Sequence, residues 1–161
     1  MNLKDKCKKI KYLFTDVDGV WTDGGITYGL ETREYKTFNV KDGFICHILI
    51  KEGLHLGIIT GRKSEIVERR GNELKFRYIM QGVKDKLKVL KELALEHDFD
   101  LSEVAYIGDD LNDLDVMRSV GLSSCPADAF DYVSTQVNYV CQRNGGRGAF
   151  REFADLILKN R

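Results

Sequence analysis

Long apolar runs and an excess of either charge are absent from this chain of 161 residues. No run approaches the length of a membrane-spanning helix, and no apolar segment follows the first lysines as a signal peptide would require. Lysine plus arginine equals aspartate plus glutamate at 25 each, so there is no basic excess for nucleic acid. We therefore expect no membrane partner, no nucleic-acid partner and a cytoplasmic location.

Cysteine is scarce and irregularly spaced. The four cysteines lie far apart, without the Cys-x-x-Cys or histidine spacing that is typical of zinc sites: Cys7, Cys46, Cys125 and Cys141. Reduced thiols are expected, in agreement with a cytoplasmic location. The length suffices for one hydrophobic core without disulfides or a structural metal, which predicts a single domain over residues 1–161.

Two carboxylates end the first apolar run. Residues 10–14 predict a short buried strand, and Asp16 and Asp18 follow it on a loop that turns at Gly19. Ligands of open α/β sheets bind at the carboxyl ends of the strands. Two such acids can act as nucleophile and general acid/base, or can bind a hard cation such as magnesium. An Asp-rich turn that only hydrogen-bonds its own backbone is the alternative.

Polar groups follow the next two predicted strands as well. Thr60 and Gly61, with Arg62 behind them, come after the strand at 54–59 and could hold a phosphate, although Thr-Gly is also common in turns. Lys86 lies near the start of the helix that follows the strand at 77–80. The helix dipole disfavours a cation there unless an anion is near.

A second acidic cluster follows the predicted strand at 104–107. Four oxygen-bearing side chains occur within five residues after a glycine: Asp109, Asp110, Asn112 and Asp113. A turn needs only one or two such groups, so this density favours a cation site.

Strands alternate with helices along the chain, which predicts an α/β fold with a doubly wound parallel sheet. The helix at 41–52 is expected to pack Phe44, Ile45, Ile48 and Leu49 on one face. In such a sheet, the acids, Thr60 and Lys86 would meet at one edge. That combination of cation site, hydroxyl and ammonium is what phosphoryl transfer requires.

Two segments stand outside this alternation. Two β-rich stretches within about 21–40 predict a hairpin, which could cover the site, contact another subunit or be a simple edge hairpin. A glycine loop at about 143–149 carries Arg147, which could clamp an anionic substrate or cap the terminal helix.

The motifs, taken in order, resemble the haloacid dehalogenase superfamily of phosphotransferases. Those that carry the resemblance are Asp-x-Asp-Gly at 16–19, Thr-Gly at 60–61, Lys86 and Gly-Asp-Asp-x-Asn-Asp at 108–113. The hairpin in place of a cap domain indicates the capless subclass. Within it, residues 15–24, 39–43, 60–64, 81–82 and 145–152 resemble the family of 3-deoxy-D-manno-octulosonate 8-phosphate phosphatases of lipopolysaccharide precursor synthesis.

The resemblance implies a role for each acid. Asp16 would attack phosphorus to form an aspartyl phosphate, while Asp18 would protonate the departing sugar oxygen and then activate water. Magnesium would be bound by Asp16, the backbone carbonyl of Asp18 and Asp109, with Asp110 and Asp113 in support.

The resemblance also implies the remaining binding groups. Thr60, Gly61 and Lys86 would hold the phosphoryl oxygens. A small sugar acid phosphate would be the substrate, bound by Lys41, Arg62 and Arg147. Such enzymes form homotetramers in which a neighbouring subunit helps to close the active site.

Three other functions are consistent with part of the pattern. Phosphatases of nine-carbon keto-deoxy sugar acid 9-phosphates share these motifs, but they carry an acidic residue at the position of Arg62. The arginine therefore favours the eight-carbon substrate. A receiver-like signalling domain also uses acids, a threonine and a lysine, but takes its acids from different strands. A non-catalytic binding or oligomerisation module would leave the complete set of catalytic side chains unexplained.

Overall fold

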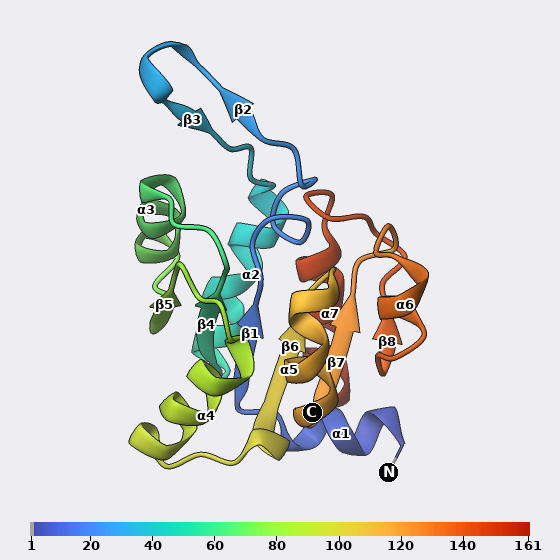
Figure 1. Ribbon diagram of the computed structural model, residues 1–161. Helices are drawn as coiled ribbons and strands as arrows, with labels where there is room; N and C mark the ends of the chain where they lie inside the picture. The colour runs from blue at the N-terminus through green and yellow to red at the C-terminus, as the bar shows by residue number, and fades with distance from the viewer. Residues whose placement is uncertain (1) are drawn as a thin grey trace.

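The computed structural model describes residues 2–161 and is built on a six-stranded parallel sheet (Figure 1). Its strand order is β5-β4-β1-β6-β7-β8. The bounds are Tyr12–Thr15 for β1, His55–Ile59 for β4, Tyr78–Met80 for β5, Val104–Ile107 for β6, Leu122–Cys125 for β7 and Tyr139–Val140 for β8. The predicted doubly wound parallel sheet is thereby confirmed, and β1 lies at the point where the strand order reverses.

Helices cover both faces of the sheet. One face carries α1 (Leu3–Lys9), α2 (Val40–Lys51), α3 (Glu65–Glu73) and α7 (Ala149–Asn160), and the other carries α4 (Lys86–His97), α5 (Leu114–Ser119) and α6 (Asp131–Ser134). Short 3-10 helices occur at Leu30–Thr32, Leu101–Glu103 and Leu111–Asp113. None of the helices within residues 2–161 combines the length and apolar character that crossing a bilayer demands.

The central strand β1 is covered by helices on both faces, which explains why consecutive residues in it are apolar. Leu13 belongs to the core beneath α2 and α7, while Phe14 points to the other face and packs against Tyr78. Both side chains are fully buried. A strand that is covered on both sides has no solvent face and therefore needs no polar alternation.

The chain between β1 and α2 forms a hairpin. Strands β2 (Thr27–Tyr28) and β3 (Glu34–Tyr35) pair antiparallel, and Figure 1 shows them projecting beyond the carboxyl edge of the sheet. The predicted hairpin within 21–40 is confirmed, and this stretch contains no cap domain.

The prediction for the buried face of α2 was wrong at Phe44. This side chain is 60% exposed, whereas Ile45, Cys46 and Leu49 are buried together with Asp42. The buried positions follow the spacing i, i+3, i+4 and i+7, so the helix is rotated relative to the predicted face. The sequence pattern favoured the apolar Phe44 over the charged Asp42 as a buried position, and the structure shows the reverse.

Candidate active site

Asp16 lies at the carboxyl end of β1, close to the centre of the sheet. Its side chain is nearly buried; Oδ1 accepts a hydrogen bond of 2.7 Å from the backbone N–H of Val17, and Oδ2 lies 2.7 Å from Nζ of Lys86. Burial and the charge of Asp113 raise the pKa of Asp16 to about 6, against the opposing effect of Lys86. The lysine ammonium therefore favours the ionised form of this carboxylate.

Lys86 reaches this carboxylate from the protein interior. It is the first residue of α4, and its Nζ also donates a 2.7 Å hydrogen bond to Oδ1 of Asp113. Burial alone would lower the pKa of Lys86, but Asp16 and Asp113 outweigh it and raise that pKa overall. The anions expected near the start of this helix are these two carboxylates.

Asp113 anchors the second acidic loop. Besides Lys86, its Oδ1 accepts from the Tyr106 hydroxyl at 2.6 Å, and its Oδ2 accepts from the backbone N–H groups of Asp109 and Asp110 at 3.2 and 3.3 Å. The residue is fully buried. A carboxylate so fully engaged orients its neighbours, which agrees with a supporting role.

Asp109 differs, because within residues 2–161 no protein donor contacts its carboxylate. Ligand atoms of Asp16, Asp109 and Asp113 lie within 4.8 Å of one another. Burial, Asp16 and Asp113 raise the pKa of Asp109 to about 8. Three carboxylates beside the single ammonium of Lys86 carry more negative charge than that ammonium offsets. They therefore fit a hard divalent ion, which would neutralise their mutual repulsion.

The close approach of the two acidic loops depends on Gly19. Its φ is +87°, and a Cβ placed there would lie 2.0 Å from Oδ2 of Asp109. Glycine is therefore required both by the backbone conformation and by the space that the carboxylate occupies.

The carboxylate of Asp110 is engaged by protein donors. It caps the 3-10 helix Leu111–Asp113, its Oδ1 accepting from the Leu111 N–H at 2.7 Å and from the Tyr132 hydroxyl at 2.6 Å. Its contacts hold the loop in shape.

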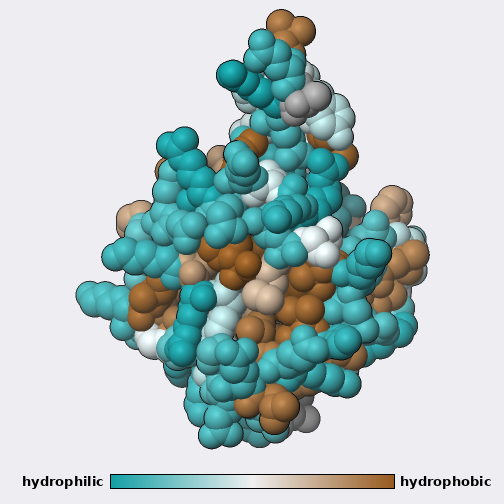
Figure 2. Space-filling model, turned by 60° about the vertical axis from the view of Figure 1, so that its left-hand side comes forward, coloured by the Kyte–Doolittle hydropathy of each residue, from teal (hydrophilic) through white to brown (hydrophobic). Residues whose placement is uncertain are grey.

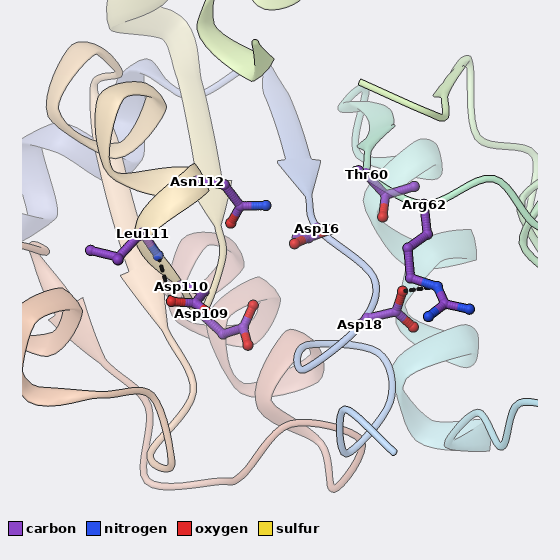
Figure 3. Close-up of a pocket in the computed structure, with 9 residues that line it drawn as sticks. Asp16, Asp18, Thr60, Arg62, Asp109, Asp110, Leu111 and Asn112 are labelled. Atoms are coloured by element: carbon purple, nitrogen blue, oxygen red, sulfur yellow. Dashed lines mark hydrogen bonds and ion pairs between the residues drawn. The ribbon is translucent and has the colours of Figure 1, made fainter. Parts of the chain in front are cut away.

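A cavity of about 370 Å³ opens over these groups, and Figure 3 shows it between the two acidic loops and the loop after β4. Thr60 is buried at the end of β4, where its N–H donates to the carbonyl of Met80 at 2.9 Å. The lining also includes Asn112, which belongs to the second acidic cluster, and Leu111, which was not predicted as a site residue. The lining residues are Asp16, Asp18, Thr60, Gly61, Arg62, Asp109, Asp110, Leu111 and Asn112.

The hairpin supplies two charged residues that sequence reasoning missed. Lys36 forms an ion pair with Oδ1 of Asp18, and Glu34 accepts a 2.6 Å hydrogen bond from Arg62. Arg62 also lies 3.8 Å from Oδ2 of Asp18. The signal in the sequence was the spacing of Glu34 and Lys36, opposite charges two residues apart and thus on one face of a strand.

Lys41 and Arg147, predicted to bind substrate, line a different cavity in this chain, together with Arg143, Arg151 and others. The glycine loop that carries Arg147 is docked on the first acidic loop. The Gly146 N–H donates to the carbonyl of Val20 at 2.9 Å. The substrate role of Lys41 and Arg147 stays a prediction.

Comparisons with known proteins agree with this geometry. The model of the haloacid dehalogenase-like hydrolases matches residues 72–152. The chain is 44% identical over 153 residues to the 3-deoxy-D-manno-octulosonate 8-phosphate phosphatase KdsC of Yersinia pestis, covering 95% of this chain and 82% of that protein.

Solved structures extend the likeness to the whole fold. The Moraxella catarrhalis 3-deoxy-D-manno-octulosonate 8-phosphate phosphatase, in complex with magnesium, phosphate and a KDO molecule, has a TM-score of 0.96 at 41% identity, covering 99% of this chain and 91% of that one. The cobalt-bound Haemophilus influenzae enzyme has a TM-score of 0.92 at 36% identity, covering 96% and 91%. This chain therefore belongs to the haloacid dehalogenase-like hydrolases, in the family of 3-deoxy-D-manno-octulosonate 8-phosphate phosphatases.

Proposed function

We propose that this chain hydrolyses 3-deoxy-D-manno-octulosonate 8-phosphate to the free sugar acid and phosphate in a magnesium-dependent reaction, as a step of lipopolysaccharide precursor synthesis. The observation that carries the proposal is the set of acids at the carboxyl ends of β1 and β6, in a chain that matches the named phosphatases over nearly its whole length. Residues 1–161 would act as one phosphatase domain, placed in the cytoplasm in keeping with four free, buried cysteines.

In this proposal Asp16 is the nucleophile. Its carboxylate attacks phosphorus, an Asp16–phosphorus bond forms and the bond from phosphorus to the sugar oxygen breaks. Lys86 and the Val17 N–H each engage one carboxylate oxygen and so fix its direction. Thr60 and Gly61 border the same cavity, where a hydroxyl and a backbone N–H can bind the phosphoryl oxygens.

Asp18 is the proton carrier. It lies at the cavity wall opposite Asp109, where it can protonate the leaving sugar oxygen and then take a proton from the water that cleaves the aspartyl phosphate (Figure 3). Magnesium, held by Asp16, Asp109 and the Asp18 carbonyl, would neutralise charge between the carboxylates and the phosphate. Asp110 and Asp113 keep the second acidic loop in place.

We propose that the chain forms a homotetramer and that a neighbouring subunit covers the cavity. The hairpin carries four exposed apolar side chains, with Leu30 at 90% exposure and Tyr28 at 69%. Figure 2 shows apolar side chains on this projection, well away from the body of the protein. Packing of the hairpin beside a neighbour's active site would bury them and would bring Lys41 and Arg147 to the substrate together with Arg62. The exposed apolar residues of the hairpin are Ile26, Tyr28, Leu30 and Tyr35.

Phosphate release from the purified protein tests the proposal directly. With magnesium present, we expect faster release from the eight-carbon 8-phosphate than from a nine-carbon keto-deoxy sugar acid 9-phosphate. Asp16→Asn should abolish turnover of both, since it removes the nucleophile, and chelation of divalent ions should also stop the reaction.

The outcomes separate the alternatives. Preference for the nine-carbon ester would keep the reaction and overturn the substrate assignment based on Arg62. Hydrolysis of neither ester would favour a binding module, and stable phosphorylation without turnover would favour a receiver-like function.

A further inference from the structure

Lys36 is buried more completely than its place on a projecting hairpin would suggest. Its side chain is only 1% exposed, although Tyr35 beside it is 56% exposed. The ammonium forms an ion pair with Oδ1 of Asp18 and lies 3.5 Å from Oε1 of Glu34. A buried lysine costs desolvation free energy, which its two carboxylate partners offset.

Arg62 completes a closed ring of four charges. From the loop after β4, it donates to Glu34 at 2.6 Å, while its Nε stays 3.8 Å from Oδ2 of Asp18. Glu34 thus takes up part of the charge of both cations, so Asp18 does not face two uncompensated positive groups. Burial raises the pKa of Glu34, but Ser64, Lys36 and Arg62 outweigh it and lower that pKa overall.

The two oxygens of Asp18 are held unequally. Lys36 contacts Oδ1 closely, whereas 3.8 Å to Arg62 is longer than a hydrogen bond. Asp18 follows β1 on a loop and is 22% exposed, so its carboxylate would rotate without such a contact. Proton transfer requires one oxygen within hydrogen-bond reach of the sugar oxygen.

We propose that Lys36 is a positioning residue for the reaction: it clamps Oδ1 of Asp18 and thereby directs Oδ2 toward the leaving oxygen. As the Asp16–phosphorus bond forms and the bond to the sugar oxygen breaks, the proton on Oδ2 passes to that oxygen. This inference rests on the proposed function and gives the hairpin a task inside its own subunit.

The test compares two leaving groups in the full-length enzyme. A sugar alkoxide needs a proton to depart, whereas p-nitrophenolate departs without one. In Lys36→Met, kcat/KM for the sugar acid phosphate should fall at least about tenfold, part of the 10²–10⁴-fold worth of a general acid. For p-nitrophenyl phosphate, kcat/KM should change less than about threefold. Lys36→Arg, which keeps a cation, should recover part of the loss.

Arg33→Met is the matched control, because it removes an exposed cation from the same hairpin without contact to Asp18. It should leave both kcat/KM values unchanged. Lys36→Gln, polar but too short to hold Asp18 in the same way, repeats the test if Lys36→Met does not fold.

Equal losses on both substrates would overturn the inference, since they would mean that Lys36 only latches the hairpin. No loss on either would also overturn it. If the wild-type chain hydrolysed neither substrate, the proposed function itself would have failed, and that result is distinct from both.

Discussion

Asp42 is a completely buried carboxylate that the chemistry does not use. It lies in the first turn of α2, but its Oδ1 accepts a 2.8 Å hydrogen bond from the N–H of Arg151 at the start of α7. Its Oδ2 has no hydrogen-bond partner among residues 2–161. Burial raises the pKa of Asp42 to about 6, although N–H groups of Arg151 and Gly148 oppose the shift. The residue joins the helix after the hairpin to the helix after the glycine loop.

This pKa makes the stability of the protein depend on pH in a defined window. An aspartate with a folded pKa of about 6 and an unfolded pKa near 3.8 holds its proton more tightly in the folded state. Its contribution to stability is therefore full below pH about 4 and is lost as the pH rises through 6. Asp42→Asn keeps an acceptor for Arg151 and removes the charge. We compare the unfolding free energy of the wild type with that of the variant at each pH. As the pH rises across the window, the wild-type value minus the variant value should fall by on the order of 3 kcal/mol, because each unit of pKa shift corresponds to about 1.36 kcal/mol.

Urea unfolding at pH values from 4 to 7 measures that difference. Asp115→Asn, which changes an 81% exposed carboxylate on α5, is the control and should show a flat difference. A flat difference for Asp42→Asn as well would contradict the prediction.

At the scale of elements, the loops that follow β1 and β6 form the site by packing against each other through glycines. Gly19 makes room for the Asp109 carboxylate, and a Cβ on Gly108 would lie 2.4 Å from Cγ of Asp113. On the other side, a Cβ on Gly145 would lie 1.9 Å from the carbonyl oxygen of Gly19. The glycine loop near the C-terminus therefore packs directly against the backbone of the first acidic loop.

Gly19→Ala should separate backbone strain from loss of the metal site. Gly19 and Gly53 have nearly the same φ, +87° and +82°, but a Cβ at Gly53 meets no atom within 4 Å. Both variants should lose about 1–2 kcal/mol from the left-handed backbone. Only Gly19→Ala should also displace Asp109, weakening magnesium binding and phosphatase activity at least about tenfold. Magnesium titration by calorimetry checks this, and equal affinity in both variants would refute the role given to Gly19.

Element boundaries and strand-end acids could be predicted because both follow from local chemistry. The strand at 104–107 has the predicted bounds, since its apolar run ends there at Gly108. Parallel pairing then brings Asp16, Thr60 and Asp109 to one edge. The pairing of Lys36 with Asp18 depends on how the hairpin folds back, which no local pattern specifies. The position of Arg147 depends on the docking of a loop in the same way.

At the scale of the whole molecule, the hairpin is connected at its base and exposed at its end. Lys36 and Glu34 tie it to the loops of its own subunit, whereas the residues farther out are largely solvent-exposed in a single chain. A two-stranded hairpin is marginally stable by itself, so contact with another subunit would add the burial that it lacks. The same contact would cover a cavity that is open in the single chain.

Leu30→Asp should therefore weaken the proposed tetramer. Leu30 is 90% exposed on the hairpin, and Leu95 is 87% exposed near the C-terminal end of α4, the opposite end of that helix from Lys86. Leu95→Asp is thus a matched control that should leave the assembly unchanged. A buried charge without a partner costs several kcal/mol, and a tetramer repeats that cost at each hairpin contact. Sedimentation velocity should show smaller species for Leu30→Asp alone. Its kcat/KM for the sugar acid phosphate should fall with the assembly, because a hairpin that closes a neighbour's site can do so only while the subunits stay together. A tetramer that survives Leu30→Asp would place the interface elsewhere on the molecule.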